Sequence, residues 1–124
     1  MFARPRDVEL VVEGRKSGNP IAFPVVLADL GGQWYAVSML GVDANWVRNV
    51  RAAHGRATIR HGTTRPVELV EVPVADRGPI LKRYLQKAPG ARSHLPVDKS
   101  APISEFDRIA ADYPVFRVDG LGVS

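Results

Sequence analysis

The chain has 124 residues, of which 45% are hydrophobic and 24% charged, a balance typical of a folded domain with its own apolar core rather than of a disordered chain. It has no cysteine, which excludes disulfides, thiolate catalysis and cysteine-based zinc or iron–sulfur sites. The 17 basic and 13 acidic residues give a net charge of +4, which favours an anionic partner. We expect one domain over residues 1–124.

The distribution of charge narrows the kind of partner. Acidic residues interrupt the basic ones, and the spacings of helix-turn-helix and zinc-finger motifs are missing, so a nucleic-acid-binding barrel is the least favoured reading. No apolar stretch approaches the ~20 residues that span a bilayer, and residues 1–7 lack the apolar core of a secretory signal. The sequence therefore predicts a cytoplasmic protein that binds a small anionic ligand, with peripheral membrane contact left open.

Three predicted strands occupy the first third of the chain, at residues 8–12, 21–30 and 33–39. They are rich in apolar and β-branched residues, and Gly31-Gly32 between the last two is a strong hairpin signal. Pro24 lies inside the second predicted strand, where it indicates an edge or a bulge because proline has no N–H to donate.

The turn at 14–20 is the most distinctive feature of the sequence. Gly14 and Gly18 bracket Arg15, Lys16 and Ser17. Backbone N–H groups, two cations and a hydroxyl in one turn are the chemistry of an anion site. The same residues also make an ordinary basic turn, and both interpretations stand at this point.

A short helix is predicted at 46–53, capped by Asp43 or Asn45 and ended by Gly55 in the left-handed conformation. Further along, the patterns predict strands at 57–60, 63–72 and 113–118, a helix capped by Asp76, an irregular segment at 91–100 of the kind that forms lids or binding segments, and helical turns at 104–111. The fold class expected is mainly β (α+β): six antiparallel strands, closed or half closed as a small barrel, with two or three short helices.

No motif for metal or hydrolytic chemistry is present in the sequence. His54, His61 and His94 lack metal-ligand spacing, and Ser17 and Ser38 have no evident base partner. Walker and Rossmann glycine patterns are also missing. A chain of this kind can still be an enzyme if a bound organic cofactor carries the reaction.

Three islands of sequence resemble the deazaflavin-dependent nitroreductase family. They are Gly14-Arg15-Lys16-Ser17-Gly18-Asn19-Pro20, the pair of segments Tyr35-Ala36-Val37-Ser38 and Asn45-Trp46-Val47-Arg48-Asn49-Val50-Arg51-Ala52, and the closing Tyr113-Pro114-Val115-Phe116. Together they cover roughly residues 10–118, nearly the whole chain. Their order and separation carry the resemblance rather than any single island.

The resemblance implies a split β-barrel of the pyridoxamine-phosphate-oxidase type that binds coenzyme F-420, an 8-hydroxy-5-deazaflavin with a phospholactyl-polyglutamate tail. By the same resemblance Arg15, Lys16 and Ser17 would hold the acidic tail. Ser38, Met39 and Leu40 would lie against the deazaflavin ring, with Ser38 as the candidate catalytic contact, and Trp46 and Asn49 would lie near the ring. The implied activity is hydride transfer to a small electron-poor acceptor such as a quinone or a nitroaromatic.

The sequence also departs from that family. Gly41-Val42-Asp43-Ala44-Asn45 replaces a proline-containing link, and Val47 and Arg48 stand where many members have tyrosine and histidine. Tyr84 and Tyr113 do not align with the tyrosines that shape the family's substrate pocket. Cofactor binding is therefore better supported than nitroreduction. The alternatives are a barrel that uses FMN and a non-catalytic module that binds F-420 or a lipid, as a monomer or a homodimer.

Overall fold

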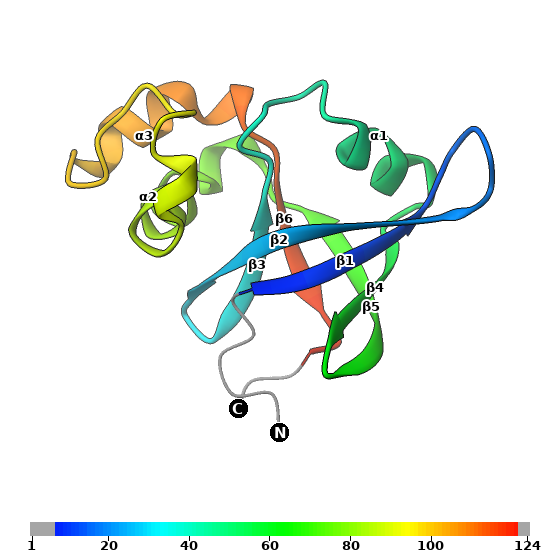
Figure 1. Cartoon of the computed structure of the whole chain (residues 1–124). Helices are drawn as coiled ribbons and strands as arrows, with labels where there is room; N and C mark the ends of the chain where they lie inside the picture. Colours follow the sequence, from blue (N-terminus) through cyan, green and yellow to red (C-terminus); the bar gives the residue numbers. More distant parts are fainter. Residues whose placement is uncertain (1–6, 122–124) are drawn as a thin grey trace.

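The computed structural model describes residues 7–121, which form a closed antiparallel barrel (Figure 1). Its six strands are hydrogen-bonded in the order β1–β2–β3–β6–β5–β4, and β4 returns to β1. This confirms the predicted fold class. The strands are β1 (Asp7–Glu13), β2 (Pro20–Leu30), β3 (Gln33–Val37), β4 (Arg56–His61), β5 (Thr63–Glu71) and β6 (Val115–Asp119).

Three α-helices accompany the barrel: α1 (Asn45–Ala52), α2 (Gly78–Lys87) and α3 (Ile103–Ile109). Figure 1 shows α2 and α3 together at one side of the barrel and α1 apart from them, with the segment after β3 crossing between the two groups. Three single 3-10 turns flank α2 and α3. Within residues 7–121, none of the helices has the length and apolarity needed to cross a bilayer.

Strand alternation produces two separate apolar cores. Successive side chains of a strand point to opposite faces, so neighbours such as Leu27 and Ala28 on β2 belong to different clusters. One cluster fills the barrel and is covered by Val47 and Val50 of α1. The other lies outside the barrel under α2 and α3, with Phe106 fully buried at its centre. The two helix groups are therefore fixed to two faces of one sheet.

Strand β2 changes its partner halfway along its length. Residues 20–26 pair with β1, whereas residues 27–30 pair with β3. The side of β2 that faces away from β1 is therefore unpaired over its first half. Pro24 lies in that half, where its missing N–H costs no bond to β3, so the prediction that this proline marks an edge is confirmed.

The structure corrects the predicted helix ends. Helix α1 starts after Ala44 without a side-chain cap, so neither Asp43 nor Asn45 caps it: Asn45 is the first helical residue, and Asp43 forms an ion pair with Arg48 at 2.9 Å. Helix α2 starts after Arg77, also without a side-chain cap, so Asp76 does not cap it. At the end of α1, His54 N–H donates to Arg51 O and Gly55 N–H to Val50 O, as in a Schellman motif. The left-handed position of that motif is His54, one residue before the predicted glycine, although Gly55 has a positive φ as well.

The third strand is also shorter than predicted. It ends at Val37, and residues 38–41 form a turn in which Gly41 N–H donates to Ser38 O. Met39 and Leu40 therefore lie in a turn rather than in a strand, and this turn begins the segment that leads to α1.

Candidate functional site

The basic turn between β1 and β2 is closed by its own backbone. Gly18 N–H donates to Gly14 O and Gly14 N–H to Asn19 O, both at 2.8 Å, and Ser17 Oγ accepts from Asn19 N–H at 3.1 Å. Among the described residues, this leaves the N–H groups of Lys16 and Ser17 without a protein acceptor. The turn is therefore ordered, and it retains two donors and two cationic side chains for a ligand.

Asn49 connects this turn to helix α1. Its side chain is 4% exposed, and Oδ1 accepts hydrogen bonds from Arg15 N–H at 3.1 Å and from the Arg15 guanidinium at 2.8 Å. The backbone N–H can only donate, which fixes the oxygen of the amide on that side. The amide NH₂ of Asn49 makes no bond to any described residue and is not sealed from solvent. The structure thus buries Asn49 where the turn contacts the helix, and the carbonyl oxygen of its side chain holds Arg15 there.

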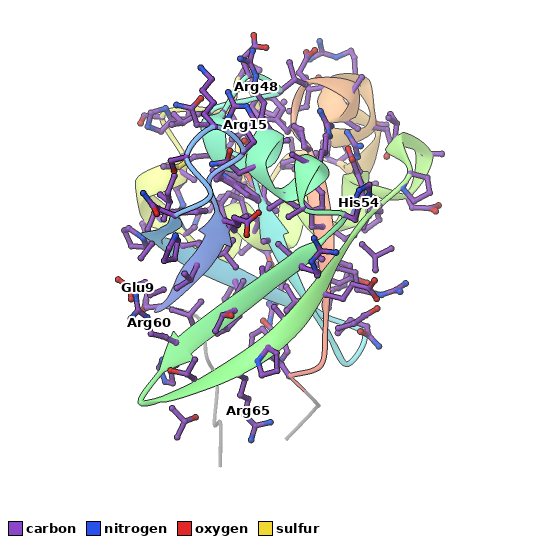
Figure 2. The ribbon with its side chains drawn as sticks, turned by 90° about the vertical axis from the view of Figure 1, so that its right-hand side faces the viewer. Glu9, Arg15, Arg48, His54, Arg60 and Arg65 are labelled. Atoms are coloured by element: carbon purple, nitrogen blue, oxygen red, sulfur yellow. The ribbon has the colours of Figure 1, made fainter. Side chains whose placement is uncertain are left out.

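A small basic pocket of about 220 Å³ opens where the turn meets α1. Six of its seven lining residues come from the two segments that the sequence singled out, the turn and the helix start; they are Gly14, Arg15, Lys16, Ser17, Asn45 and Asn49, and Ile21 completes the wall. Figure 2 shows Arg15 and Arg48 at this same end of the molecule, on the turn and on α1 respectively. The pocket thus offers hydrogen-bond donors and positive charge to an anion.

A larger apolar groove of about 800 Å³ lies beside the unpaired half of β2. Its walls come from β2 (Phe23 to Val26), the turn after β3 (Met39 and Leu40), Trp46 of α1, the end of α2 (Tyr84, Gln86 and Lys87) and the turn that follows α2 (Ala88 to Ala91). The groove exists because β2 leaves β3 there, so that no neighbouring strand fills the space. A groove of this size, apolar with a few polar groups, is typical of a site for an organic ligand.

The basic pocket and the apolar groove adjoin each other. Ile21 in the pocket and Phe23 in the groove are two residues apart on β2 and therefore share a face of the strand. Asn45 in the pocket and Trp46 in the groove are consecutive at the start of α1. A ligand with an apolar body and an anionic extension would match this arrangement.

Trp46 is the aromatic residue at the junction. It is half-buried, with its ring centroid 5.7 Å from that of Phe23 and 5.6 Å from that of Phe116. Phe116 belongs to the barrel core, so the indole is held by that core on one side and lines the groove on the other. Leu40 is 66% exposed at the groove edge, an unusual exposure for leucine beside an apolar cavity.

Ser38 lies away from the groove surface. It is 1% exposed, its Oγ donates to Gly41 O at 2.7 Å, and its N–H donates to Pro114 O at 2.9 Å. These bonds hold the turn that presents Met39 and Leu40. The direct contact with a ring or an acceptor that we expected for Ser38 stays a prediction, since the observed geometry gives its hydroxyl a structural partner.

The end of α2 was not identified from the sequence as part of the site. Tyr84 and Lys87 both line the groove, as do Pro89, Gly90 and Ala91. The irregular segment that follows, 91–100, is packed against the helices rather than free to close: Leu95 and Val97 are buried, and Tyr113 Oη donates to His94 O at 3.1 Å. Nothing in the sequence showed that the end of α2 faces a groove.

A network of three charged groups fixes the other end of α1. Glu71 at the end of β5 accepts two hydrogen bonds from Arg51, at 2.7 and 3.1 Å, and one from Arg77 at 3.1 Å. Arg77 is 5% exposed and also donates to Val72 O and Ala110 O. These bonds tie α1 to β5 and to the helices on the outer face of the sheet, and hydrogen bonds from Arg51 lower the pKa of Glu71.

This network predicts a stability difference that depends on pH. Because the folded-state pKa of Glu71 is lowered from its ordinary value of 4.5, its contribution is present at neutral pH and is lost as the pH falls through the folded-state pKa. We expect Glu71→Gln to lower the free energy of unfolding by about 1–2 kcal/mol at pH 7, a value discounted for the partial exposure of Glu71. Urea denaturation of both proteins should show the gap narrowing below about pH 4.5. A gap that stays constant to pH 3 would contradict the assignment.

Residues 7–121 hold no group of three His, Asp or Glu side chains placed to bind a metal ion.

No family model matches the chain, and no curated protein matches it in sequence. Solved structures do match it in fold. One is an F420-H2 dependent reductase, with 19% identity and a TM-score of 0.61 over 96% of this chain and 98% of the other.

Two further structures extend the comparison. An F420 reductase matches with 16% identity and a TM-score of 0.54, over 98% of this chain and 90% of its own. A heme binding protein from Mycobacterium smegmatis matches with 18% identity and a TM-score of 0.58, over 93% of this chain and 46% of its own. At these identities the comparisons establish a shared split-barrel fold, and proteins of this fold bind chemically different ligands.

Proposed function

We propose that this protein is an oxidoreductase that uses reduced coenzyme F-420 to reduce a small electron-poor acceptor such as a quinone or a nitroaromatic. The observation that carries the proposal is the adjoining pair of cavities, a basic pocket of about 220 Å³ beside an apolar groove of about 800 Å³. The F-420 reductases that share the fold support the same reading.

The residues of the two cavities fit the two parts of the cofactor. The ring would lie in the groove against Trp46, Phe23 and Met39, where apolar walls exclude water. The phosphate and the acidic tail would meet Arg15, Lys16 and Ser17, whose cations and N–H groups form charge-assisted hydrogen bonds. When bound, reduced F-420 would supply a hydride, that is one proton with two electrons, and would itself be oxidised; a quinone would take its second proton from water.

The protein's own share of the reaction is positioning. Asn49 holds the basic turn on α1, the contacts of Trp46 with Phe116 anchor the ring wall to the barrel core, and Ser38 fixes the turn that carries Met39 and Leu40. Each of these groups is braced by buried structure, which keeps the groove preformed and lowers the cost of ordering a ligand.

A fluorescence titration with oxidised F-420 tests the proposal, with FMN, FAD and hemin titrated in parallel. The double variant Arg15→Ala/Lys16→Ala removes both cations of the turn, and we expect it to weaken F-420 binding about tenfold to a hundredfold. Its control is Lys99→Ala/Arg108→Ala, which lowers the net charge equally at exposed positions outside both cavities.

The outcomes separate the candidates. Saturable F-420 binding that only the first double variant weakens would support the proposal, as would oxidation of reduced F-420 that depends on an added quinone. Tight FMN or hemin binding without F-420 binding would keep the groove but overturn the cofactor. Binding of F-420 without turnover by any quinone or nitroaromatic acceptor would favour a cofactor-binding module instead of an enzyme.

A further inference from the structure

Two polar groups of α2 line the apolar groove without a hydrogen-bond partner among residues 7–121. Tyr84 and Lys87 are three residues apart and therefore lie on one face of the helix, and both line the groove. Within residues 7–121, neither the Tyr84 hydroxyl nor the Lys87 ammonium makes a hydrogen bond, and Lys87 forms no ion pair with any carboxylate.

Tyr84 is the more informative of the two. The residue is 4% exposed and its ring belongs to the outer core, yet its hydroxyl is not sealed from solvent. A buried phenol ordinarily finds a partner, because an unpaired hydroxyl in an apolar site costs free energy. Burial raises the pKa of Tyr84 to about 12, so that the group stays protonated and can donate. The groove is the cavity that Tyr84 lines, and a ligand there can accept this bond.

Lys87 adds a positive charge in the last turn of the same helix. The other polar side chains of the groove are Asp7, at the start of β1, and Gln86. Asp29 is the nearby carboxylate on β2. Its two oxygens accept from the Arg83 guanidinium at 3.2 Å, and the charge of Lys87 also acts on it, although the two groups form no ion pair. The α2 side of the groove thus presents a neutral donor and a cation, whereas the basic pocket is lined by the turn and by α1. Figure 1 shows α1 and α2 apart from each other.

We propose that Tyr84 and Lys87 form a second polar subsite, which binds the carboxylate of an apolar organic acid whose body lies in the groove. Two donors one helical turn apart match the two oxygens of a carboxylate, and the apolar walls from Val8, Val26 and Val37 match an apolar body. As a binding site this inference stands on the groove alone. If the groove also binds the hydride acceptor, the inference rests on the proposed function. The acceptor is then an electron-poor molecule that carries a carboxylate side chain.

The binding arm of the test uses naphthoate and its methyl ester, titrated calorimetrically into the protein without cofactor. We expect the acid to bind about tenfold more tightly than the ester, as a charge-assisted hydrogen bond predicts. Lys87→Met keeps the apolar stem and should remove this preference, and Tyr84→Phe should reduce it about threefold. Lys99→Met, an exposed lysine outside the groove, should leave the preference unchanged.

Thermal unfolding distinguishes a ligand-binding role of Tyr84 from a structural one. Because its hydroxyl has no hydrogen-bond partner in the described part of the chain, Tyr84→Phe should not lower the melting temperature, whereas loss of a structural hydrogen bond would. The turnover arm compares a naphthoquinone that carries a propanoate side chain with its methyl ester. We expect a higher kcat/KM for the acid, and we expect this difference to disappear in Lys87→Met.

Three results would overturn the subsite: equal binding of acid and ester, an acid preference that survives in Lys87→Met, or a preference that Arg15→Ala removes instead. An acid preference that depends on Lys87 in a protein that fails to bind F-420 would support the subsite and overturn the proposed function. The two proposals can therefore fail separately.

Discussion

Replacing Asn49 by aspartate is expected to weaken F-420 binding about tenfold or more while leaving the fold intact. The two side chains have the same shape, and an aspartate oxygen can accept both bonds that Arg15 donates at 2.8 and 3.1 Å. The basic turn therefore stays on α1. The substitution also replaces the amide NH₂ beside the pocket by a carboxylate oxygen, and an acidic cofactor tail would meet negative charge there. Fluorescence titration at low and moderate salt measures the loss, which should shrink as salt rises.

Asn49→Leu provides the comparison. Leucine leaves the part-buried Arg15 N–H without its acceptor and releases the turn, so we expect it to lower the free energy of unfolding by about 1–2 kcal/mol and to weaken F-420 binding as well. The pair separates docking of the turn from charge in the pocket. If aspartate bound F-420 as tightly as asparagine does, the acidic tail would lie elsewhere and the assignment of the basic pocket would be wrong.

Gly55→Ala is expected to be strongly destabilising, lowering the free energy of unfolding by about 3 kcal/mol or more. Gly55 joins α1 to β4 with a φ of +84°, and its carbonyl accepts from Leu69 N–H at 2.8 Å. A Cβ there would lie 2.4 Å from Leu69 O, and this neighbour is backbone of β5 that cannot move without breaking the barrel pairing. Chemical denaturation measures the loss.

Gly62→Ala is the matched control for that experiment. Gly62 also has a positive φ, +74°, but a Cβ at this position meets no atom within 4 Å. It should therefore cost only the conformational penalty of an L-residue in the left-handed region, about 1–2 kcal/mol. If both variants lost the same free energy of unfolding, local movement would have relieved the contact with Leu69 O. The close approach of Gly55 to β5 would then not affect stability.

Local sequence was sufficient for the strands and for the turn. The alternation of Val8, Leu10 and Val12, the Gly31-Gly32 turn and the proline in β2 each report a short-range preference of the backbone, and the structure agrees with all three. Helix ends were less predictable, because a side chain that can cap a helix can equally pair with a neighbour, as Asp43 does with Arg48.

In the candidate site, too, some residues could be predicted from the sequence and others could not. Arg15, Lys16 and Ser17 were recognisable because glycines and cations are adjacent in the chain, and the resemblance added Trp46 and Asn49; the structure gathers all of these except Trp46 in the basic pocket. The resemblance also pointed to Ser38, whose hydroxyl is bonded to Gly41 O. Tyr84 and Lys87 were not predicted as site residues. The pattern of an amphipathic helix indicates that one face is buried, but it does not show whether that face packs on the core or lines a groove.

By itself, then, the sequence determined which segments become strands, where the chain turns and which turn carries the positive charge, since these depend on neighbours within a few residues. The tertiary structure alone decided that β2 changes partner after residue 26, that a groove opens along its unpaired half, and that the end of α2 faces this groove. Those features depend on residues far apart in the sequence, such as Pro24 and Tyr84, which line the same groove although they are 60 positions apart, and no local pattern encodes such a distance.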